Sequence, residues 1–341
     1  MIPRSIHRSL VLVFATAAFA VTGCSLEKSD DVSEYREALP EASNVRVAGP
    51  ESGPSSPGGT SSAASGSGFL AGGAEPAATS AEWYRFTRDV RDGVNLVTAG
   101  VLGSVWFVAH TEPTTVGEGY AEWGPYTDAL DPVTWRLRIE RIEDHEYRYS
   151  LEGRPRASRS NDDYLSVLSG TGYGRADDRH GDGEFTVDLD AARTLDPERH
   201  ADDAGTVTIT HDLPPSASRR LGALPREITA NIDPPGDAWL TVTSKANEDG
   251  SGQLDLSALV DVDDSKTTAL EDVAILSRFR ADGAGRADVV IGEGDVPSEI
   301  GALSIAECWG SDFSRVYYAD SVQAEPTEGD ASACVYAASD D

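Results

Sequence analysis

Apolar residues recur at helical spacing in the stretch that follows residue 80. Side chains three or four positions apart run from Trp83 to Val108, which predicts a helix over residues 83–109. Residues 94–109 are apolar on nearly every side, so we expect a core helix that the rest of the fold covers on most faces. The alternative is a membrane segment, although this run is shorter than the roughly 20 apolar residues that a spanning helix needs.

Further along the chain the hydrophobic period changes to two residues. Alternation of apolar and polar positions predicts about a dozen strands. The clearest runs are 135–139, 147–151, 185–189, 207–209, 254–262 and 273–279. Turn signals separate such runs at 143–145, 182–183, 249–252 and 282–285, and Asp-Gly pairs between alternating strands indicate hairpins.

Consecutive hairpins place neighbouring strands of the sequence side by side in the sheet. The predicted fold is therefore mainly β: an antiparallel meander that forms a curled sheet or barrel-like domain packed around the residue 83–109 helix. The alternative is two packed β subdomains that divide near Pro214-Pro215 or Pro234-Pro235.

The N-terminus has the three parts of an export signal. Arg4 and Arg8 precede an apolar core over residues 10–20, and Val21-Thr22-Gly23-Cys24 follows. This tetrapeptide resembles the lipobox of bacterial membrane lipoproteins, and the resemblance covers only the first two dozen residues. It implies removal of residues 1–23, a lipid on Cys24 and, because Ser25 follows the cysteine, an address at the outer membrane or cell surface. The alternative is an ordinary secretory signal that is cleaved after 18–20, an A-x-A pattern.

The amino-acid composition of the rest of the chain separates a tether from a globular domain. Twenty of the 32 residues from 49 to 80 are Gly, Ser or Pro, a composition that does not support a packed core. We therefore predict a lipidated N-terminus and flexible tether over 24–80 and a β-rich globular domain over 81–341.

The cysteine count supports both the lipid and a disulfide. Of the three cysteines, Cys308 and Cys334 can pair in an exported protein, which leaves Cys24 as the odd one. Two buried free thiols are the alternative.

Net charge and the spacing of motifs restrict the partners and binding sites that this chain can have. The chain carries 58 acidic and 28 basic side chains, a net charge of −30, which disfavours nucleic acid as a partner. The scattered histidines 110, 145, 180, 200 and 211 have no metal-binding spacing, and we expect them to face solvent. Acidic segments at 177–184 and 247–252 fail the calcium-loop pattern at its twelfth position, so we interpret them as hairpin turns and predict no metal and no cofactor.

No catalytic motif stands out, so we favour a lipid-anchored envelope lipoprotein whose domain is a non-catalytic binding or scaffold module. Its partner could be an apolar ligand, a glycan or another envelope protein. Aromatic residues at 123, 126, 135, 147 and 149 are typical of a sugar platform, but we expect them to pack in the core. The alternative function is an exported hydrolase with an unrecognised site, because a catalytic triad is assembled in space.

Overall fold

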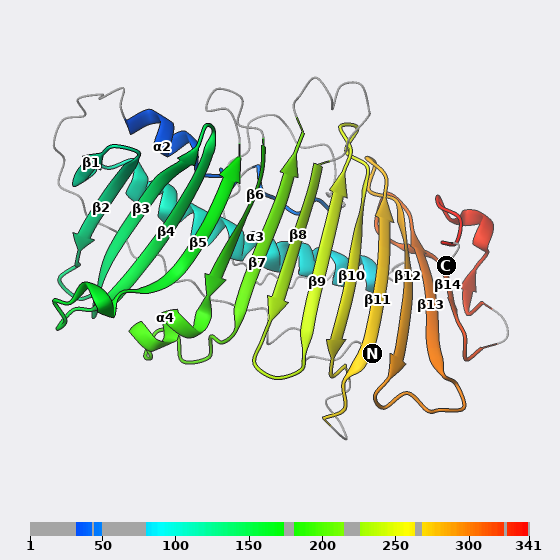
Figure 1. The fold of residues 1–341 in the computed structure, drawn as a ribbon. Coiled ribbons are helices and arrows are strands. Elements are labelled where there is room, and N and C mark those ends of the chain that lie inside the picture. Colours follow the sequence, from blue (N-terminus) through cyan, green and yellow to red (C-terminus); the bar gives the residue numbers. More distant parts are fainter. Residues whose placement is uncertain are drawn as a thin grey trace, which may run out of the picture.

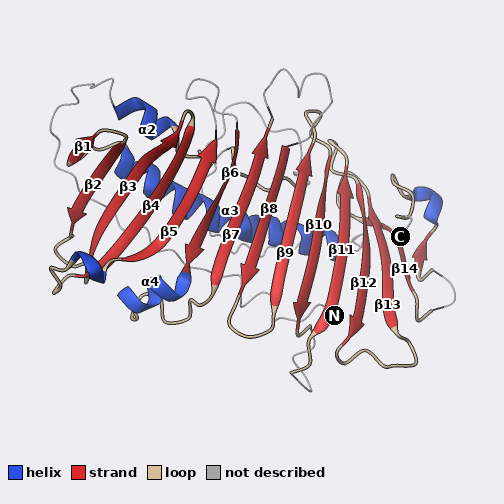
Figure 2. Cartoon of the chain, viewed as in Figure 1, coloured by secondary structure: helices blue, strands red, loops and turns tan. Residues whose placement is uncertain are grey.

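One antiparallel sheet dominates the computed structural model, which describes residues 32–42, 44–49, 80–173, 181–214, 226–262, 268–323 and 326–339. Within these residues fifteen strands follow one another in chain order, each paired with the next, and the sheet is not closed (Figures 1 and 2). The predicted meander is confirmed. The pairs β7·β8 and β8·β9 keep the sheet continuous where we considered a division into subdomains.

The strands are β1 (Thr115–Gly117), β2 (Tyr120–Tyr126), β3 (Val133–Glu143), β4 (Glu146–Pro155), β5 (Leu165–Tyr173), β6 (Gly181–Asp188), β7 (Thr206–Leu213), β8 (Arg226–Asp233), β9 (Trp239–Ala246), β10 (Gly252–Val260), β11 (Glu271–Phe279), β12 (Gly285–Glu293), β13 (Ala302–Trp309), β14 (Arg315–Asp320) and β15 (Glu328–Gly329). The helices are α2 (Ser33–Glu37), α3 (Glu82–Ala109) and α4 (Leu189–Leu195), with short 3-10 turns at Asn161–Asp163 and Ala331–Ala333.

Side-chain alternation gives the sheet an apolar inner face and a polar outer face. The registers align one inner row across ten strands: Tyr149, Gly170, Phe185, Ile209, Ala230, Val242, Leu256, Ile275, Val289 and Ile305. Most of this row is buried in the main hydrophobic core. The two-residue period of the sequence therefore determines which face the core uses.

Helix α3 lies across the inner face, behind the strands in the view of Figure 1. Its 28 residues span about 42 Å, so one helix can cover many strands. The buried side of the helix carries Trp83, Tyr84, Thr87, Val90, Val94, Val97, Thr98, Val101, Leu102, Val105 and Ala109. Burial of this long apolar stripe confirms the predicted core helix on the side that faces the sheet.

The opposite side of α3 keeps apolar side chains exposed within the described structure. Leu96 is 59% exposed and Trp106 45%. The expectation that the fold covers this helix on most faces is therefore wrong, because a single open sheet can cover only one side. Helix α3 is also the one described helix with the length and composition to cross a membrane, and 39% of its most apolar window is buried.

Opposite charges hold the two ends of α3. At the N-terminus the buried Glu307 carboxylate of β13 accepts hydrogen bonds from the backbone N–H groups of Glu82 (2.9 Å) and Trp83 (2.6 Å). At the C-terminus the Arg36 guanidinium of α2 donates to the carbonyl oxygens of Ala109 (2.8 Å) and Thr111 (3.0 Å). An anion at the first turn and a cation at the last both stabilise a helix through its dipole.

A second inner row contributes polar groups on alternate strands. Ser244 of β9 and Ser277 of β11 lie in the same cross-strand row as Glu307. Ser277 Oγ accepts from Thr87 Oγ1 of α3 at 3.0 Å, and Ser244 Oγ accepts from the Ala48 backbone N–H at 3.0 Å. The first bond fixes the position of the helix on the sheet, and the second fixes the segment at Ala48, more specifically than apolar contact alone.

The segment before the predicted domain belongs to the same core. Val32, Tyr35 and Val47 are buried in the main cluster, and the Asn95 side chain of α3 hydrogen bonds to both the N–H (2.8 Å) and the C=O (3.0 Å) of Val47. Our sequence analysis places the start of the domain at residue 81. The described residues 32–42 and 44–49 precede that boundary, and their apolar side chains pack in the same cluster.

Three of the four predicted turns lie between strands as expected. The turns at 143–145, 249–252 and 282–285 connect β3–β4, β9–β10 and β11–β12, with positive φ at His145, Gly250 and Gly283. Asp182-Gly183, by contrast, lies inside β6, and this turn prediction is wrong. A Cβ at residue 183 would lie 3.0 Å from the His211 ring, so close packing within the sheet explains the glycine there.

Cys308 of β13 and Cys334 form a disulfide, as predicted. The bond fastens the segment after β15 to the end of the sheet. Loop closure over this separation contributes about 3.5 kcal/mol to the free energy of unfolding in the chain-entropy model.

Glu307→Gln tests the charge at the helix N-terminus. We expect the free energy of unfolding in urea to fall by about 2–4 kcal/mol, because the change removes the anion that neutralises both the helix terminus and Arg315, whose Nε lies 2.7 Å from Glu307. The matched control is Glu328→Gln, which removes an exposed partner of the same arginine and should change stability by at most about 0.5 kcal/mol. Equal losses in the two variants would contradict this role of Glu307.

Candidate functional site

A hollow of about 500 Å³ opens where four neighbouring strands end at one edge of the sheet. Strands β5 and β7 end there and β6 and β8 begin there, and the arrowheads of β5 and β7 lie at the upper edge in Figure 1. The lining residues are Thr171, Tyr173, Asp182, Gly183, Glu184, Thr210, His211, Asp212, Glu227 and Thr229. Hydroxyl and carboxylate groups therefore dominate the hollow.

The hydroxyl groups belong to a larger set on the outer face. Thr171, Thr210, Thr229 and Thr243 fall in one cross-strand row with Glu184. Cross-strand pairs join Thr186 to Thr208 (2.9 Å) and Thr229 to Thr243 (3.1 Å) through their hydroxyl oxygens. Such pairs stabilise a sheet, and each hydroxyl retains capacity for a further hydrogen bond.

The carboxylates of the hollow differ in their partners. Asp182, Glu184 and Asp212 form no ion pair with another described residue, whereas Glu227 lies 3.5 Å from Lys245 Nζ. The local charge is therefore negative. A ligand with phosphate groups would be repelled, while a neutral or cationic ligand with hydroxyl or amino donors would be accepted.

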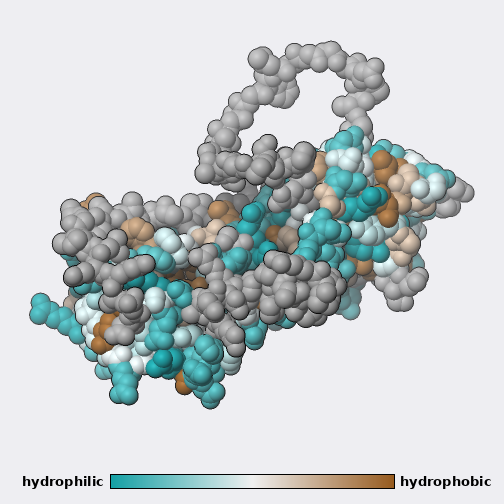
Figure 3. All heavy atoms as spheres, turned by 90° about the horizontal axis from the view of Figure 1, so that it is seen from above, coloured by the Kyte–Doolittle hydropathy of each residue, from teal (hydrophilic) through white to brown (hydrophobic). Residues whose placement is uncertain are grey.

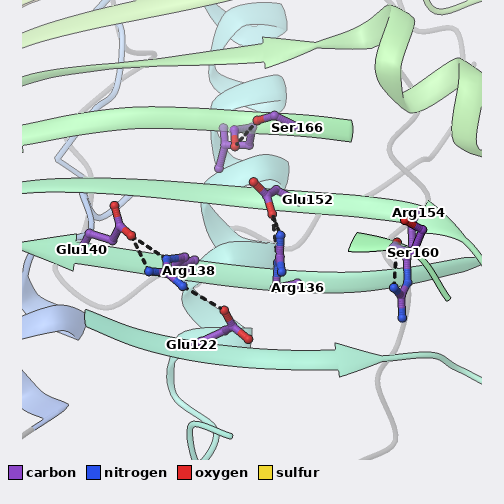
Figure 4. A network of polar contacts seen from close by, with 9 residues as sticks. Glu122, Arg136, Arg138, Glu140, Glu152, Arg154, Ser160 and Ser166 are labelled. Carbon is purple, nitrogen blue, oxygen red and sulfur yellow. Dashed lines mark hydrogen bonds and ion pairs between the residues drawn. The ribbon is translucent and has the colours of Figure 1, made fainter. Parts of the chain in front are cut away.

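The outer face between β2 and β5 is different, because several of its charges form ion pairs with one another. Arg138 pairs with Glu140 at 2.6 Å and with Glu122 at 3.3 Å, and Arg136 pairs with Glu152 at 2.5 Å (Figure 4). Arg136 and Arg138 are thereby engaged by carboxylates of the same face. The hollow of β5–β8 is therefore the better candidate for a binding site on this face.

Tyr173 provides an exposed aromatic ring at the rim of the hollow. It is 46% exposed, and its hydroxyl donates to Glu146 Oε1 at 2.8 Å. This hydrogen bond to a carboxylate raises the pKa of Tyr173, so the phenol stays neutral. The ring offers an apolar surface beside polar groups, a combination that suits molecules with both kinds of surface.

His211 borders the hollow from the inner-face row. It is 8% exposed, and neither ring nitrogen has a hydrogen-bond partner among the residues described. Burial lowers the pKa of His211, and the Gly181 backbone and the carboxylates of Asp182 and Asp212 oppose this only in part. The expectation that His211 faces solvent is wrong, because the glycine at position 183 leaves room for its ring inside the sheet.

Other predicted features fall in different places. Cys24 and His180 lie outside the described residues, as does much of the 177–184 segment. Asp249 accepts from the Ser251 hydroxyl and backbone N–H in the β9–β10 hairpin, which is the turn that we predicted. In the part of the chain that the structure describes, no group of three His, Cys, Asp or Glu side chains could hold a metal ion.

The predicted aromatic platform is part of the core. Trp123, Tyr147 and Tyr149 are buried and Trp135 is partly buried, so the packing interpretation is confirmed for these residues. Tyr126 is 40% exposed but lies on β2, three strands away from β5, and does not line the hollow. Sequence analysis missed Tyr173, whose position at a strand end gave no periodic signal.

We compared the chain with known protein families, proteins and structures. No protein-family model, curated protein or solved structure matches this chain. The candidate site therefore rests on its own geometry.

The pH dependence of stability tests the environment of His211. The folded pKa is lower than the unfolded value of about 6.5, so both states are neutral above that pH. Below that pH the histidine binds a proton more readily in the unfolded chain than in the folded one. The free energy of unfolding therefore falls with decreasing pH, by at most about 1.4 kcal/mol per pH unit. We expect His211→Leu to remove this loss in urea unfolding between pH 7.5 and 5.5. The exposed His145→Asn control should retain it, and an unchanged slope in His211→Leu would contradict the assignment.

Proposed function

We propose that the protein is a lipid-anchored cell-envelope lipoprotein whose sheet domain is a non-catalytic module that binds glycans. The proposal combines the lipobox at Val21-Thr22-Gly23-Cys24 with the different use of the two faces of the sheet. Helix α3 and the segment 32–49 pack on the inner face, which argues against an apolar ligand carried there. The outer face remains open to polar partners.

One observation carries the choice of a glycan: the hollow combines hydroxyls, carboxylates and an exposed aromatic ring. Hydroxyls of Thr171, Thr210 and Thr229 can both donate and accept hydrogen bonds, and the carboxylates of Glu184 and Asp212 accept them. Sugar hydroxyls match both kinds of partner, and charge-assisted hydrogen bonds to carboxylates are the stronger ones. The apolar C–H face of a sugar ring can lie on Tyr173.

The charge of the hollow restricts the class of glycan. Neutral sugars and amino sugars fit the surplus of carboxylates, whereas phosphorylated or uronic acid polymers do not. Because the hollow is open, we expect affinity to come from several successive sugar units and single sugars to bind weakly.

Substitution of Cys24 tests the proposed lipid anchor. In a bacterial host fed an alkyne-bearing fatty acid, the full chain should acquire the label, and Cys24→Ala should remain an unlabelled precursor that retains residues 1–23. The control Cys334→Ala removes another thiol and should keep the label. Acyl labelling that persists in Cys24→Ala, seen by gel fluorescence and intact mass, would disprove the lipidation site.

The glycan site is tested by titration calorimetry of the full-length protein in detergent with soluble oligosaccharides of neutral hexoses and of amino sugars. We expect one class to bind, and Tyr173→Ala combined with Glu184→Gln to weaken that binding by about tenfold or more, or about 1.4 kcal/mol. Asp255→Asn is the matched control, because Asp255 lies in the same outer row as Glu184 but outside the hollow. Binding of neither class, or equal affinity in all variants, would refute the site.

A further inference from the structure

The exposed side of helix α3 changes character halfway along the helix. Its first half bears charged residues such as Arg85 and Asp92, which are exposed. Its second half presents Leu96, Ala99, Gly103 and Trp106, a stripe of apolar residues that are exposed within the described structure. We call Leu96, Ala99, Gly103 and Trp106 the outward stripe. Contiguous exposed apolar surface of this kind marks an interaction site.

The path of the chain identifies what lies close to this stripe. Val32 is already buried in the core, so only residues 25–31 separate it from Cys24. Fully extended, this spacer reaches about 25–30 Å. The Gly/Ser/Pro-rich stretch adds no reach, because both ends are fixed to the domain: Val47 is bound by Asn95, and Ser80 pairs with Ser314.

The spacer also meets the domain at the same end of α3 as the stripe. Helix α2 begins one residue after Val32, and its Arg36 donates to the carbonyl oxygens of Ala109 and Thr111 at the C-terminus of α3. A lipid on Cys24 would therefore hold the second half of α3 within one short spacer of the bilayer.

We propose that the outward stripe rests on the lipid surface to which Cys24 anchors the protein. This inference rests on the lipidation in the proposed function and adds an orientation to it. Leu96 enters the interfacial region of the bilayer, and Trp106 lies at its level, where indole rings are favoured. The helix side of the sheet then faces the membrane, and the outer face, with its hollow, faces away from it.

Charge is consistent with this orientation. Asp182, Glu184 and Asp212, whose carboxylates form no ion pair with a described residue, lie at the hollow and would stay away from lipid headgroups. On the first half of α3, Arg88 and Arg91 are paired with Asp89 and Asp92, so the helix presents little net charge beside the stripe.

A fluorescent probe can locate the stripe relative to the bilayer. The full-length acylated protein in phosphatidylcholine vesicles would carry an environment-sensitive NBD label at Gly103→Cys or Ser257→Cys. With Cys24 acylated and Cys308 bonded to Cys334, the introduced thiol is the single reactive one. A Cβ at residue 103 meets nothing within 4 Å, and Ser257 is an exposed position on the outer face, so neither change disturbs packing.

We expect NBD emission at Gly103→Cys to shift to the blue and rise several-fold on vesicles, with no change at Ser257→Cys. Adding Leu96→Asp should return the Gly103→Cys probe to its emission in water without releasing the protein from floating vesicles. If the protein floats and the two probes are equally hydrated, the orientation is refuted and the anchor stands. If it does not float, the anchor itself fails and the inference falls with it. A concentration-dependent shift at Gly103→Cys without vesicles would instead assign the stripe to a second copy and overturn the inference.

Discussion

The attachment of helix α3 across the inner face is the interaction on which the rest of the structure depends. An open sheet of fifteen described strands has a long apolar face that must be covered, and one helix of 28 residues covers much of it. Glu307 and Arg36 hold the two ends with charges that match the helix dipole. Apolar contact supplies the attraction, and these polar contacts fix where the helix lies.

The same attachment gives the two faces of the sheet different roles. The inner face is occupied by α3 and by residues 32–49, so its polar groups, Ser244, Ser277 and Glu307, serve the helix and the segment. The outer face has no covering layer among the described residues, and its hydroxyls and carboxylates remain available. Seen from above, hydrophilic and hydrophobic side chains both occur on the described surface (Figure 3). The proposed glycan site and the proposed membrane orientation both rely on this division.

Only part of the candidate site could be predicted from the sequence. The alternation at Phe185 and Ile209 identified two of the four strands that carry it, β6 and β7, whereas β5 and β8 were not among the clear runs. The pattern at Asp182-Gly183 indicated a turn, because an Asp-Gly pair has that meaning in most contexts, yet the pair lies within β6. The glycine there makes room for the ring of His211 from the neighbouring strand, and no local pattern shows a contact between residues so far apart in the chain.

The sequence by itself determined the mainly β class, six of the strands, three of the four predicted turns, the meander order, the apolar helix and the disulfide partners, because period, turn chemistry and cysteine parity are local or countable properties. Tertiary structure alone decided which side of α3 stays exposed within the described structure, that Val32 and Val47 join the core, and that four strand ends form one polar hollow. Each of these depends on register and on the order of strands in space. The hydrophobic pattern along the chain predicts which residues are buried. Which residues pack over them depends on strand register and on the packing of the whole fold.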